Sequence, residues 1–516
     1  MSGGDLPGGP GTEGRIGRVL ALRGWPLLAV LAVQAALSLQ LIWANTAFQD
    51  EGLYLWAGHL ELAHLLRQAP VPDFATYFSG SPLIYPTVGA AADSLGGLAA
   101  ARLLSLAFML TTTVALHGVT RRLFGSRASA FFAAALFAGL GPAQFIGAFA
   151  TYDAMALALL AAATWLGVRA ASARPASRTA LIVVSALVLA LANATKYASA
   201  LFDPVVVAVT TLTLWRLHGR AAALRAGAGL TGATILVLAA AYRLGGAPYA
   251  QGISYSTLGR AAGTDPALTV LSASARWTGA AAVLGVLGAA AIWGAWRSVP
   301  ARALAGTLAA AVFLAPLQQA RIHTEVSLFK HVGYGAWFAS AAGGYLLAAL
   351  PQAAAALNGA RVLRAAIGVV AAAAAAGYLV AAGQFGSWPN ARVMTAAISS
   401  LSRPGGRYLA EDYGVPAYYL RRVVRWQQWS NTFNFGYTDP VTGRYLQNGP
   451  AYADAIRAQY FTVIVLAFGD TEATDRVITA DLRRYGGYRL TSVLPYRTRV
   501  GRGTYRIWTL VSPAGQ

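Results

Sequence analysis

The sequence predicts a polytopic α-helical membrane protein with a small soluble α/β domain at its C-terminal end. Of its 516 residues, 56% are hydrophobic and 11% are charged, whereas soluble domains average roughly 25% charged residues. Apolar runs long enough to cross a bilayer recur between residues 25 and 383. From about Ser387 onward, charged residues return and short strand and helix patterns alternate.

Eleven apolar runs are expected to be transmembrane helices, and together they define a membrane domain over residues 23–386. Residues 1–22 are rich in Gly and polar residues and are predicted to be a disordered cytoplasmic tail. The stretch 81–97 is short and interrupted by Pro and Gly, so we expect a re-entrant or interfacial segment within the first large loop, 46–97. The eleven runs lie around 25–45, 98–119, 129–149, 153–171, 179–194, 198–215, 226–244, 277–296, 303–319, 332–350 and 362–383.

Arginines in alternate loops indicate the orientation of these spans. The loops that follow the even-numbered spans are Arg-rich, and the opposite loops are poorer for their length. Because Arg and Lys are retained on the cytoplasmic side, the N-terminus is expected inside and the C-terminal domain outside the cytoplasmic membrane. The net charge of +21 is therefore largely an orientation signal, and a nucleic-acid partner is not expected. The absence of cysteine excludes disulfides and thiol chemistry.

Residues 387–516 are expected to form the extracytoplasmic α/β domain. Strands are predicted at 407–410, 461–468 and 504–511, and an amphipathic helix at 474–485. The continuous apolar run at 461–468 is typical of a strand that is buried on both faces. The domain contains no Gly-rich phosphate-binding loop.

Three carboxylates mark the predicted outer ends of membrane spans. Asp50 and Glu51 directly follow the first span, and Asp153 lies at the outer end of the third or fourth span. Carboxylates are costly near lipid, so their default interpretation is a functional site that faces water or a polar cavity. Two simpler interpretations remain: Asp50 and Glu51 mark the solvated end of a helix, or Asp153 caps the N-terminus of the next one.

Cations are expected at the same face. The chain contains two lysines, Lys196 and Lys330, and both are predicted at the outer membrane boundary. Arg321, His323 and His331 surround Lys330 in sequence. Snorkelling to lipid headgroups would explain each lysine without a ligand. The clustering around Lys330 instead favours a site for a lipid-linked phosphate.

A carboxylate and several cations at one membrane face suit the transfer of a sugar from a polyprenyl phosphate. A carboxylate can take the proton of an acceptor hydroxyl, and cations can stabilise the phosphate as it leaves. Tyr54, Tyr85, Tyr197 and His323 are candidate substrate contacts, although an interfacial aromatic belt explains the tyrosines equally well.

The order of several short motifs resembles the GT-C membrane glycosyltransferases, in particular glycosyltransferase family 39. This family includes protein O-mannosyltransferases and the aminoarabinose transferases of lipid A. The resemblance covers roughly the first 200 residues and, more weakly, 320–345. Its motifs are FQDEGLY at 48–54, SPLIYP at 81–86, ARLLS at 101–105, TRRLFG at 120–125 and ATYDA at 150–154.

The resemblance implies roles for individual residues. Asp50 would be the catalytic base of an inverting transfer, Glu51 would position the base or the acceptor, and Asp153 would shape the site or bind a metal. Lys196, Arg321, Lys330 and His331 would hold the donor phosphate. The resemblance does not extend to the C-terminal domain. The identity of the acceptor in the bacterial cell envelope, whether protein, glycan or lipid, therefore stays open.

Other functions and a metal cofactor also stay open at this point. A transporter or flippase for a lipid-linked sugar would need similar residues, but transporters place them near the bilayer midplane. A scaffold that binds envelope polymers would leave Asp50 and Glu51 unexplained. A divalent ion could be held through oxygen ligands, with Asp50 and Asp153 as the candidates.

Overall fold

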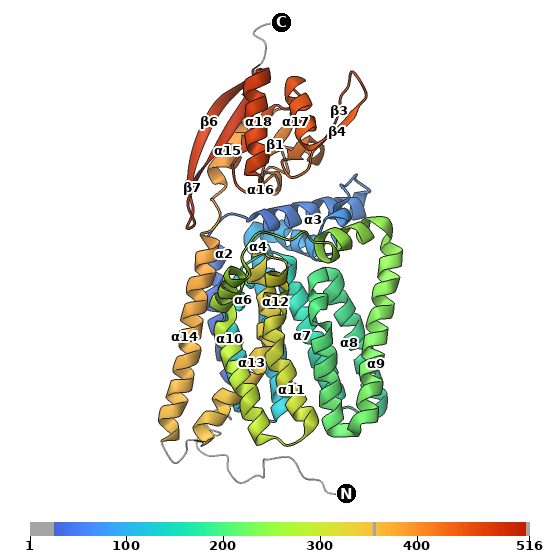
Figure 1. Ribbon diagram of the computed structural model, residues 1–516, viewed down its shortest axis with the longest axis vertical. Coiled ribbons are helices and arrows are strands. Elements are labelled where there is room, and N and C mark those ends of the chain that lie inside the picture. Colours follow the sequence, from blue (N-terminus) through green and yellow to red (C-terminus); the bar gives the residue numbers. More distant parts are fainter. Residues whose placement is uncertain (1–24, 354–357, 512–516) are drawn as a thin grey trace. The chain divides into compact units, whose positions relative to one another are not determined.

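The protein is described by a computed structural model that covers residues 25–353 and 358–511 (Figure 1). The predicted disordered tail at 1–22 lies outside these residues. Two compact units form the chain, and each is considered by itself. The helical unit comprises Met1–Ile42, Pro72–Tyr85 and Arg102–Ala382, and the sheet unit comprises Trp43–Val71, Pro86–Ala101 and Gly383–Gln516. Two segments of the predicted first loop thus group with the C-terminal region.

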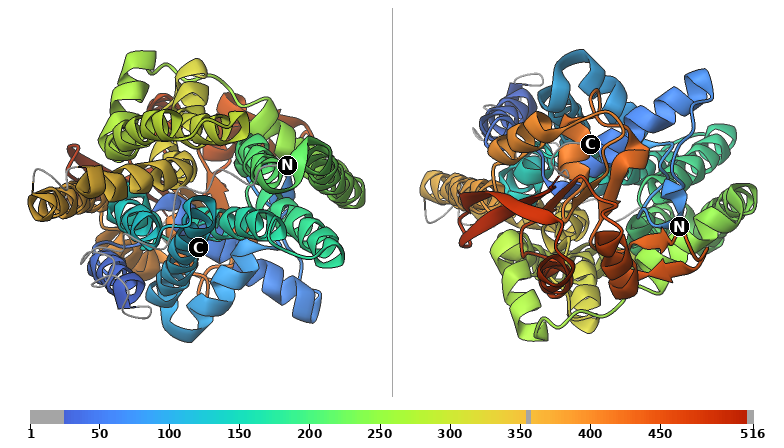
Figure 2. Two further views of the ribbon diagram at one scale, coloured as in Figure 1. Left: turned by 90° about the horizontal axis from the view of Figure 1, so that it is seen from below. Right: turned by 90° about the horizontal axis from the view of Figure 1, so that it is seen from above.

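The helical unit contains helices at every predicted apolar run. Its long helices run alongside one another and are seen nearly end-on in Figure 2. Runs 198–215 and 226–244 both lie in α9, where Gly219 has a non-helical backbone that separates them. The helices are α2 (Trp25–Ile42), the C-terminal part of α4 (Tyr85–Phe124), α5 (Arg127–Gly139), α6 (Gly141–Ile146), α7 (Tyr152–Ala170), α8 (Pro175–Thr195), α9 (Asp203–Ile253), α10 (Ala267–Ala295), α11 (Val299–Ala310), α12 (Leu314–Arg321), α13 (Leu328–Ala353) and α14 (Gly359–Phe385).

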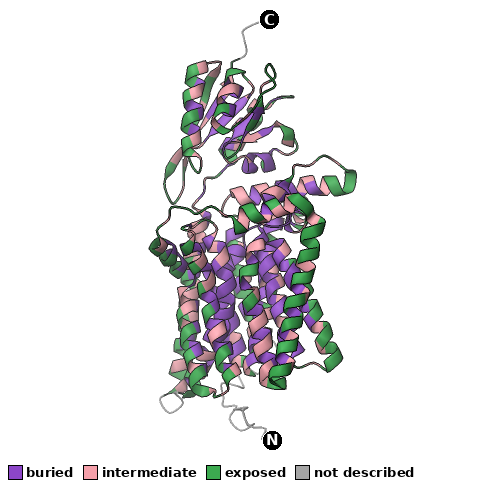
Figure 3. Ribbon diagram, turned by 45° about the vertical axis from the view of Figure 1, so that its right-hand side comes forward, coloured by how far each residue is buried: buried purple, intermediate pink, exposed green. Residues whose placement is uncertain are grey.

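The chain is a multi-pass membrane protein. Within the described residues, seven helices are long and apolar enough to cross a membrane, and Pro26–Ile42 and Arg127–Gly139 are shorter apolar helices. Buried residues gather in the interior of this unit and exposed residues on its outer helices, as Figure 3 shows. Helix α13 is buried along most of its length. The number of eleven spans and their orientation stay predictions.

Small residues bring α13 close to its neighbours on two sides. A Cβ atom at Gly288 of α10 would lie 2.1 Å from the backbone oxygen of Ala342 in α13. A Cβ atom at Gly344 of α13 would lie 2.6 Å from the backbone oxygen of Ser129 in α5. Glycine at these positions permits the close backbone approach that is typical of membrane helix packing.

The predicted re-entrant stretch enters helix α4. The helix begins at Tyr85, and its backbone is non-helical at Gly96 and Gly97, where Gly97 has a φ of 66°. A left-handed φ costs glycine little, because it has no Cβ atom. The chain leaves the sheet unit at Ala101, a few residues after this break, and the rest of α4 belongs to the helical unit.

A five-stranded mixed sheet forms the centre of the sheet unit, in the order β2-β1-β5-β7-β6. Strand β1 is parallel to both β2 and β5, whereas β7 is antiparallel to β5 and β6. The strands are β1 (Tyr408–Ala410), β2 (Trp429–Asn431), β5 (Val463–Leu466), β6 (Tyr488–Arg497) and β7 (Arg502–Leu510), with β3 (Gly436–Thr438) and β4 (Tyr445–Gln447) forming a separate hairpin.

The predicted C-terminal strands and helix are confirmed as β1, β5, β7 and α18 (Glu472–Tyr485). All four residues of β5 are buried, as its continuous apolar run predicts. Ile464 and Leu466 pack with Ile478, Leu482 and Trp508 in the core. The remaining helices of the unit are α3 (Gln49–Arg67), α15 (Arg392–Leu401), α16 (Gly414–Tyr419) and α17 (Asn448–Arg457).

Candidate active site

Asp153 is completely buried in the first turn of α7, inside the helical unit. One carboxylate oxygen, Oδ1, lies 3.2 Å from the Lys196 ammonium, and the other accepts a hydrogen bond of 3.1 Å from the Thr151 hydroxyl. The Tyr334 hydroxyl donates to the Asp153 backbone oxygen at 3.4 Å. The Thr151 side chain makes no capping hydrogen bond to α7, so simple helix capping does not account for this arrangement.

Lys196 follows the last residue of α8 and is 3% exposed. The turn that carries it is held by the chain at 79–81. Tyr197 donates its backbone N–H to the Ser79 oxygen at 3.0 Å, and Ser81 donates its own to the Ala194 oxygen at 2.9 Å. A buried cation beside a buried carboxylate does not fit a lysine that reaches for lipid headgroups, because snorkelling requires an exposed ammonium.

A second group of cations surrounds His331 at the start of α13. Lys330 is 2% exposed, and its ammonium lies 5.5 Å from the centre of the Phe329 ring. Lys196, Lys330 and Arg260 all lie within electrostatic range of His331. The His331 Nε2 atom is buried without a hydrogen-bond partner in the described part of the chain. We call the three cations Lys196, Arg260 and Lys330 the cation cluster, and His331 lies among them.

The structure separates the predicted phosphate ligands into two sets: Lys196, Lys330 and His331 lie together, whereas Arg321 is exposed. The predicted substrate contact His323 is exposed as well. The Arg321 side chain donates to Gln318 at 3.1 Å, and the His323 ring bonds the Asp265 backbone oxygen at 3.1 Å. Sequence reasoning missed Arg260, which lies between the predicted spans 226–244 and 277–296.

Two of the candidate tyrosines, Tyr85 and Tyr197, belong to the helical unit. Tyr85 is fully buried, and its ring centre lies 5.6 Å from that of Tyr152. The half-buried Tyr197 has a buried hydroxyl without a partner among the described residues. The aromatic-belt interpretation is therefore wrong for Tyr85, which instead stands beside the residue that precedes Asp153.

Asp50 and Glu51 occupy the first turn of α3, within the sheet unit. Glu51 is completely buried, and its carboxylate accepts the Phe48 backbone N–H at 3.0 Å, which closes the start of the helix. Asp50 is half-buried. Both negative charges are favoured by the partial positive charge of a helix N-terminus. The adjacent carboxylates therefore differ in environment, and Glu51 fixes the turn on which Asp50 stands.

A buried charged group anchors α3, and sequence reasoning missed it. The Asp93 carboxylate, in the N-terminal part of α4, is completely buried and bonds His59 of α3 at 2.6 Å and Arg421 at 2.9 Å. It also accepts a hydrogen bond from the Tyr418 hydroxyl of α16. Replacing one member would leave a buried charge without its partner, which is strongly destabilising. This group therefore positions α3.

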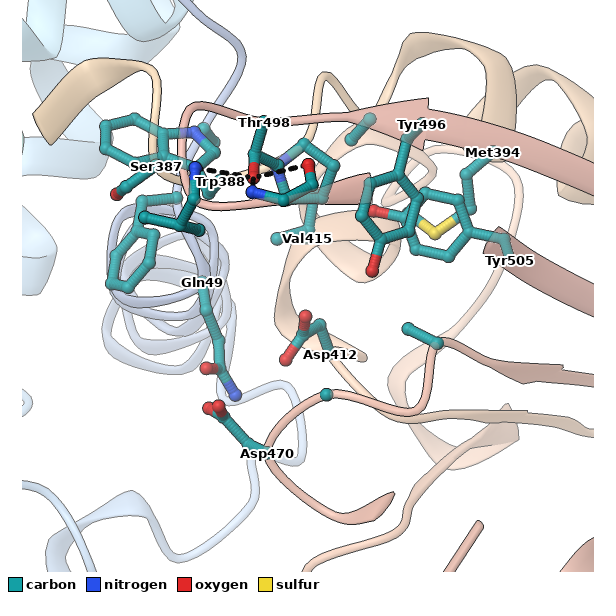
Figure 4. Close-up of a pocket in the computed structure, with 18 of the residues that line it drawn as sticks. Gln49, Ser387, Trp388, Met394, Asp412, Val415, Asp470, Tyr496, Thr498 and Tyr505 are labelled. Atoms are coloured by element: carbon teal, nitrogen blue, oxygen red, sulfur yellow. Dashed lines mark hydrogen bonds between the residues drawn. The ribbon is translucent and has the colours of Figure 1, made fainter. Parts of the chain in front are cut away.

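A cavity of about 350 Å³ lies beside the start of α3 in the same unit (Figure 4). Its walls include Gln49, Asp412 and Asp470 together with the aromatic residues Tyr496 and Tyr505. Burial and the charges of Glu411 and Asp470 raise the pKa of Asp412 to about 7. Burial and the charges of Glu411 and Asp50 raise the pKa of Asp470.

The sequence did contain a signal for these acids. Asp412 follows β1 and Asp470 follows β5, and these two strands are parallel neighbours. Ligand-binding residues commonly follow the carboxyl ends of parallel strands. The described residues contain no group of three or more His, Asp or Glu side chains arranged to hold a metal ion.

No known family model matches the sequence, and no curated protein matches it. Solved structures do share its fold. ArnT from Cupriavidus metallidurans, bound to undecaprenyl phosphate, has a TM-score of 0.59 and 15% identity over 96% of this chain and 100% of its own. The Archaeoglobus fulgidus oligosaccharyltransferase has a TM-score of 0.56 and 15% identity over 94% of this chain and 74% of its own. Mycobacterial arabinofuranosyltransferase AftD has a TM-score of 0.52 and 17% identity over 94% and 40%.

Proposed function

We propose that this chain, which has the GT-C fold, is a membrane glycosyltransferase. It moves a sugar from a polyprenyl-phosphate-linked donor to an envelope acceptor at the outer face of the cytoplasmic membrane. The reaction inverts the configuration at the anomeric carbon of the sugar. The observation that carries this proposal is the cation cluster, in which Lys196 and Lys330 are buried and Lys196 is paired with Asp153. The fold is shared with a protein bound to undecaprenyl phosphate and with two other sugar transferases.

The cation cluster suits a phosphate that becomes a leaving group. Lys196 and Lys330 are buried, so their charges act in a medium that screens them less than water does. The phosphodiester of the donor becomes a phosphate monoester and gains negative charge as the bond to the sugar breaks, and preorganised cations stabilise that charge without reorganising. Asp153 holds the Lys196 ammonium in place through a contact of 3.2 Å.

Asp50 is assigned the role of general base. The acceptor hydroxyl oxygen forms a bond to the anomeric carbon, the bond from that carbon to the phosphate oxygen breaks, and the hydroxyl proton passes to Asp50. The electron pair of the broken bond leaves with the polyprenyl phosphate. A carboxylate in the first turn of a helix, held by Glu51, has the fixed position that proton transfer requires.

The test uses purified protein in nanodiscs, a panel of radiolabelled polyprenyl-phosphate sugars and a membrane extract as acceptor source. Wild type should transfer label, Asp50→Asn should bind donor without transferring it, and Lys330→Ala should bind donor weakly. Asp73→Asn, an exposed acid outside the site, is the matched control. Saturable binding of a donor by wild type without any transfer would overturn the proposal in favour of a transporter.

A further inference from the structure

The cavity beside α3, lined by Gln49, Asp412, Asp470, Tyr496 and Tyr505, is the feature of the sheet unit that the transfer chemistry leaves unused. We call it the α3 cavity. Its walls come from the start of α3, the segment 387–394, the ends of β1 and β5, and the β6–β7 hairpin. Figure 4 shows the Asp412 and Asp470 carboxylates on the same side of the cavity as Gln49.

The two carboxylates that line this wall accept no hydrogen bond from the described protein groups. No hydrogen bond from the described residues reaches the side chain of Asp412 or Asp470. Glu411 differs, because its buried carboxylate accepts the backbone N–H groups of Ala467, Gly469 and Thr471 at 2.9–3.0 Å. Glu411 therefore holds the loop after β5, and its two acidic neighbours keep their acceptor capacity for a ligand.

Aromatic rings form a second wall. The centres of the Tyr496 and Tyr505 rings lie 4.7 Å apart, and Trp388 also lines the cavity. The Trp388 indole donates its N–H to the Thr46 backbone oxygen at 3.0 Å, which fixes the ring. Rings with a polar edge, beside carboxylates that accept hydroxyl protons, match a ligand with apolar C–H faces and many hydroxyl groups.

The α3 cavity is also close to the proposed base. Gln49 lines it, and Asp50 is the next residue in the same helical turn. The charge of Asp50 reaches Asp470, because it contributes to the raised pKa of that wall residue. A hydroxyl group held in this cavity would therefore belong to the substrate that Asp50 deprotonates.

Charge decides which acceptors fit. Two carboxylates, Asp412 and Asp470, line the cavity, and the charge of Glu411 acts on both of them. Arg502, the cation among the lining residues, is exposed. A phosphate or carboxylate on the ligand would meet these acids at close range, where like charges are unfavourable. A neutral or amino-bearing sugar would not experience this repulsion.

We propose that the α3 cavity is the acceptor site and selects a neutral or cationic polyhydroxylated glycan over an anionic one. This inference rests on the proposed transferase function, since it names the acceptor of that reaction. Hydrogen bonds from ligand hydroxyls to the two aspartates supply affinity, and the aromatic wall supplies orientation.

The test measures equilibrium binding to the full-length protein in nanodiscs, without donor. The probes are neutral mannan, arabinan and galactan oligosaccharides and the same oligosaccharides carrying one terminal phosphate. At least one neutral probe should bind, and its phosphorylated form should bind at least tenfold more weakly. Asp412→Asn and Asp470→Asn should each weaken binding of the neutral probe roughly tenfold, since each replaces one acceptor oxygen by an NH2 group. In the double variant, the difference in affinity between the neutral and the phosphorylated probe should become smaller.

Asp454→Asn is the matched control, because Asp454 belongs to the same unit and pairs with Arg457 on exposed α17. A thermal melt establishes that each variant is folded, and Tyr505→Phe, which keeps the ring, should retain most of the binding. Equal or tighter binding of the phosphorylated probes would overturn the inference. So would the absence of any binding by a wild type that transfers sugar to a membrane extract. Binding of neutral probes by a wild type that transfers nothing would instead refute the proposed function and support the cavity as a glycan site.

Discussion

Breaking the Asp153–Lys196 pair should have opposite consequences for donor binding according to which partner is removed. Both side chains are buried, with Lys196 3% exposed and Asp153 fully covered. Asp153→Asn leaves the Lys196 ammonium available to a phosphate, whereas Lys196→Met removes it. We therefore expect Lys196→Met to weaken donor binding at least tenfold and Asp153→Asn to preserve or strengthen it.

The stability cost follows from the distance. At an effective dielectric constant of about 20, two unit charges 3.2 Å apart attract each other by about 5 kcal/mol. Desolvation offsets part of this attraction, yet removing one partner leaves the other charge buried, which typically costs about 3–5 kcal/mol. Each single variant should therefore lose stability of this order. The double variant should lose much less than the sum, because neither charge remains.

The assay is a double-mutant cycle of the free energy of unfolding in detergent, with donor binding measured on the same four proteins. A coupling energy of about 2 kcal/mol or more is expected. Additive losses, with a coupling below about 0.5 kcal/mol, would show that the two charges do not depend on each other. Equal loss of donor binding in both single variants would refute the assignment of Lys196 to the phosphate.

Four further predictions concern individual groups. Asp50→Asn should lower the transfer rate by about a hundredfold or more while the melting temperature stays unchanged, as single-turnover kinetics and a thermal melt would show. Lys330→Ala should weaken donor binding in an equilibrium assay more than Arg321→Ala does, because Arg321 is exposed; the reverse order would place the phosphate elsewhere. The pKa of Asp412 is about 7, above its ordinary value of about 4. Its contribution to the free energy of unfolding is therefore fully present below about pH 4 and is lost as the pH rises through about 7. Asp412→Asn should flatten the dependence of the unfolding free energy on pH in this range. An unchanged slope would contradict the raised pKa. Transfer should persist after treatment with EDTA, because the Asp153 carboxylate already holds an ammonium and a hydroxyl group, and loss of activity that Mg²⁺ or Mn²⁺ restores would show a metal requirement.

Local patterns in the chain were sufficient for the membrane class and the main elements. Apolar runs predict helices because a membrane span needs about 20 apolar residues in succession, and such a run is visible without any partner. The strand β5 was predictable for a similar reason, as its four residues are all apolar and all buried. The rarity of lysine and the acids beside the spans were likewise enough to select Asp50, Asp153, Lys196 and Lys330 as candidates.

Tertiary structure was needed to assign a role to each candidate residue, because these roles depend on the packing of segments that are distant in sequence. Adjacent Asp50 and Glu51 look equivalent in the sequence, yet packing of the sheet unit buries Glu51 completely and leaves Asp50 half-buried. Arg260 joins the cation cluster through the packing of its loop near α13.

The acids of the α3 cavity show the same limit. Asp412 and Asp470 are 58 positions apart in the sequence, and they meet because β1 and β5 pair in parallel. The sequence by itself determined which segments enter the membrane and which residue types are available for chemistry, since hydropathy and charge are local properties. Tertiary structure decided which of those groups are buried together, because burial and pairing arise only when distant segments pack.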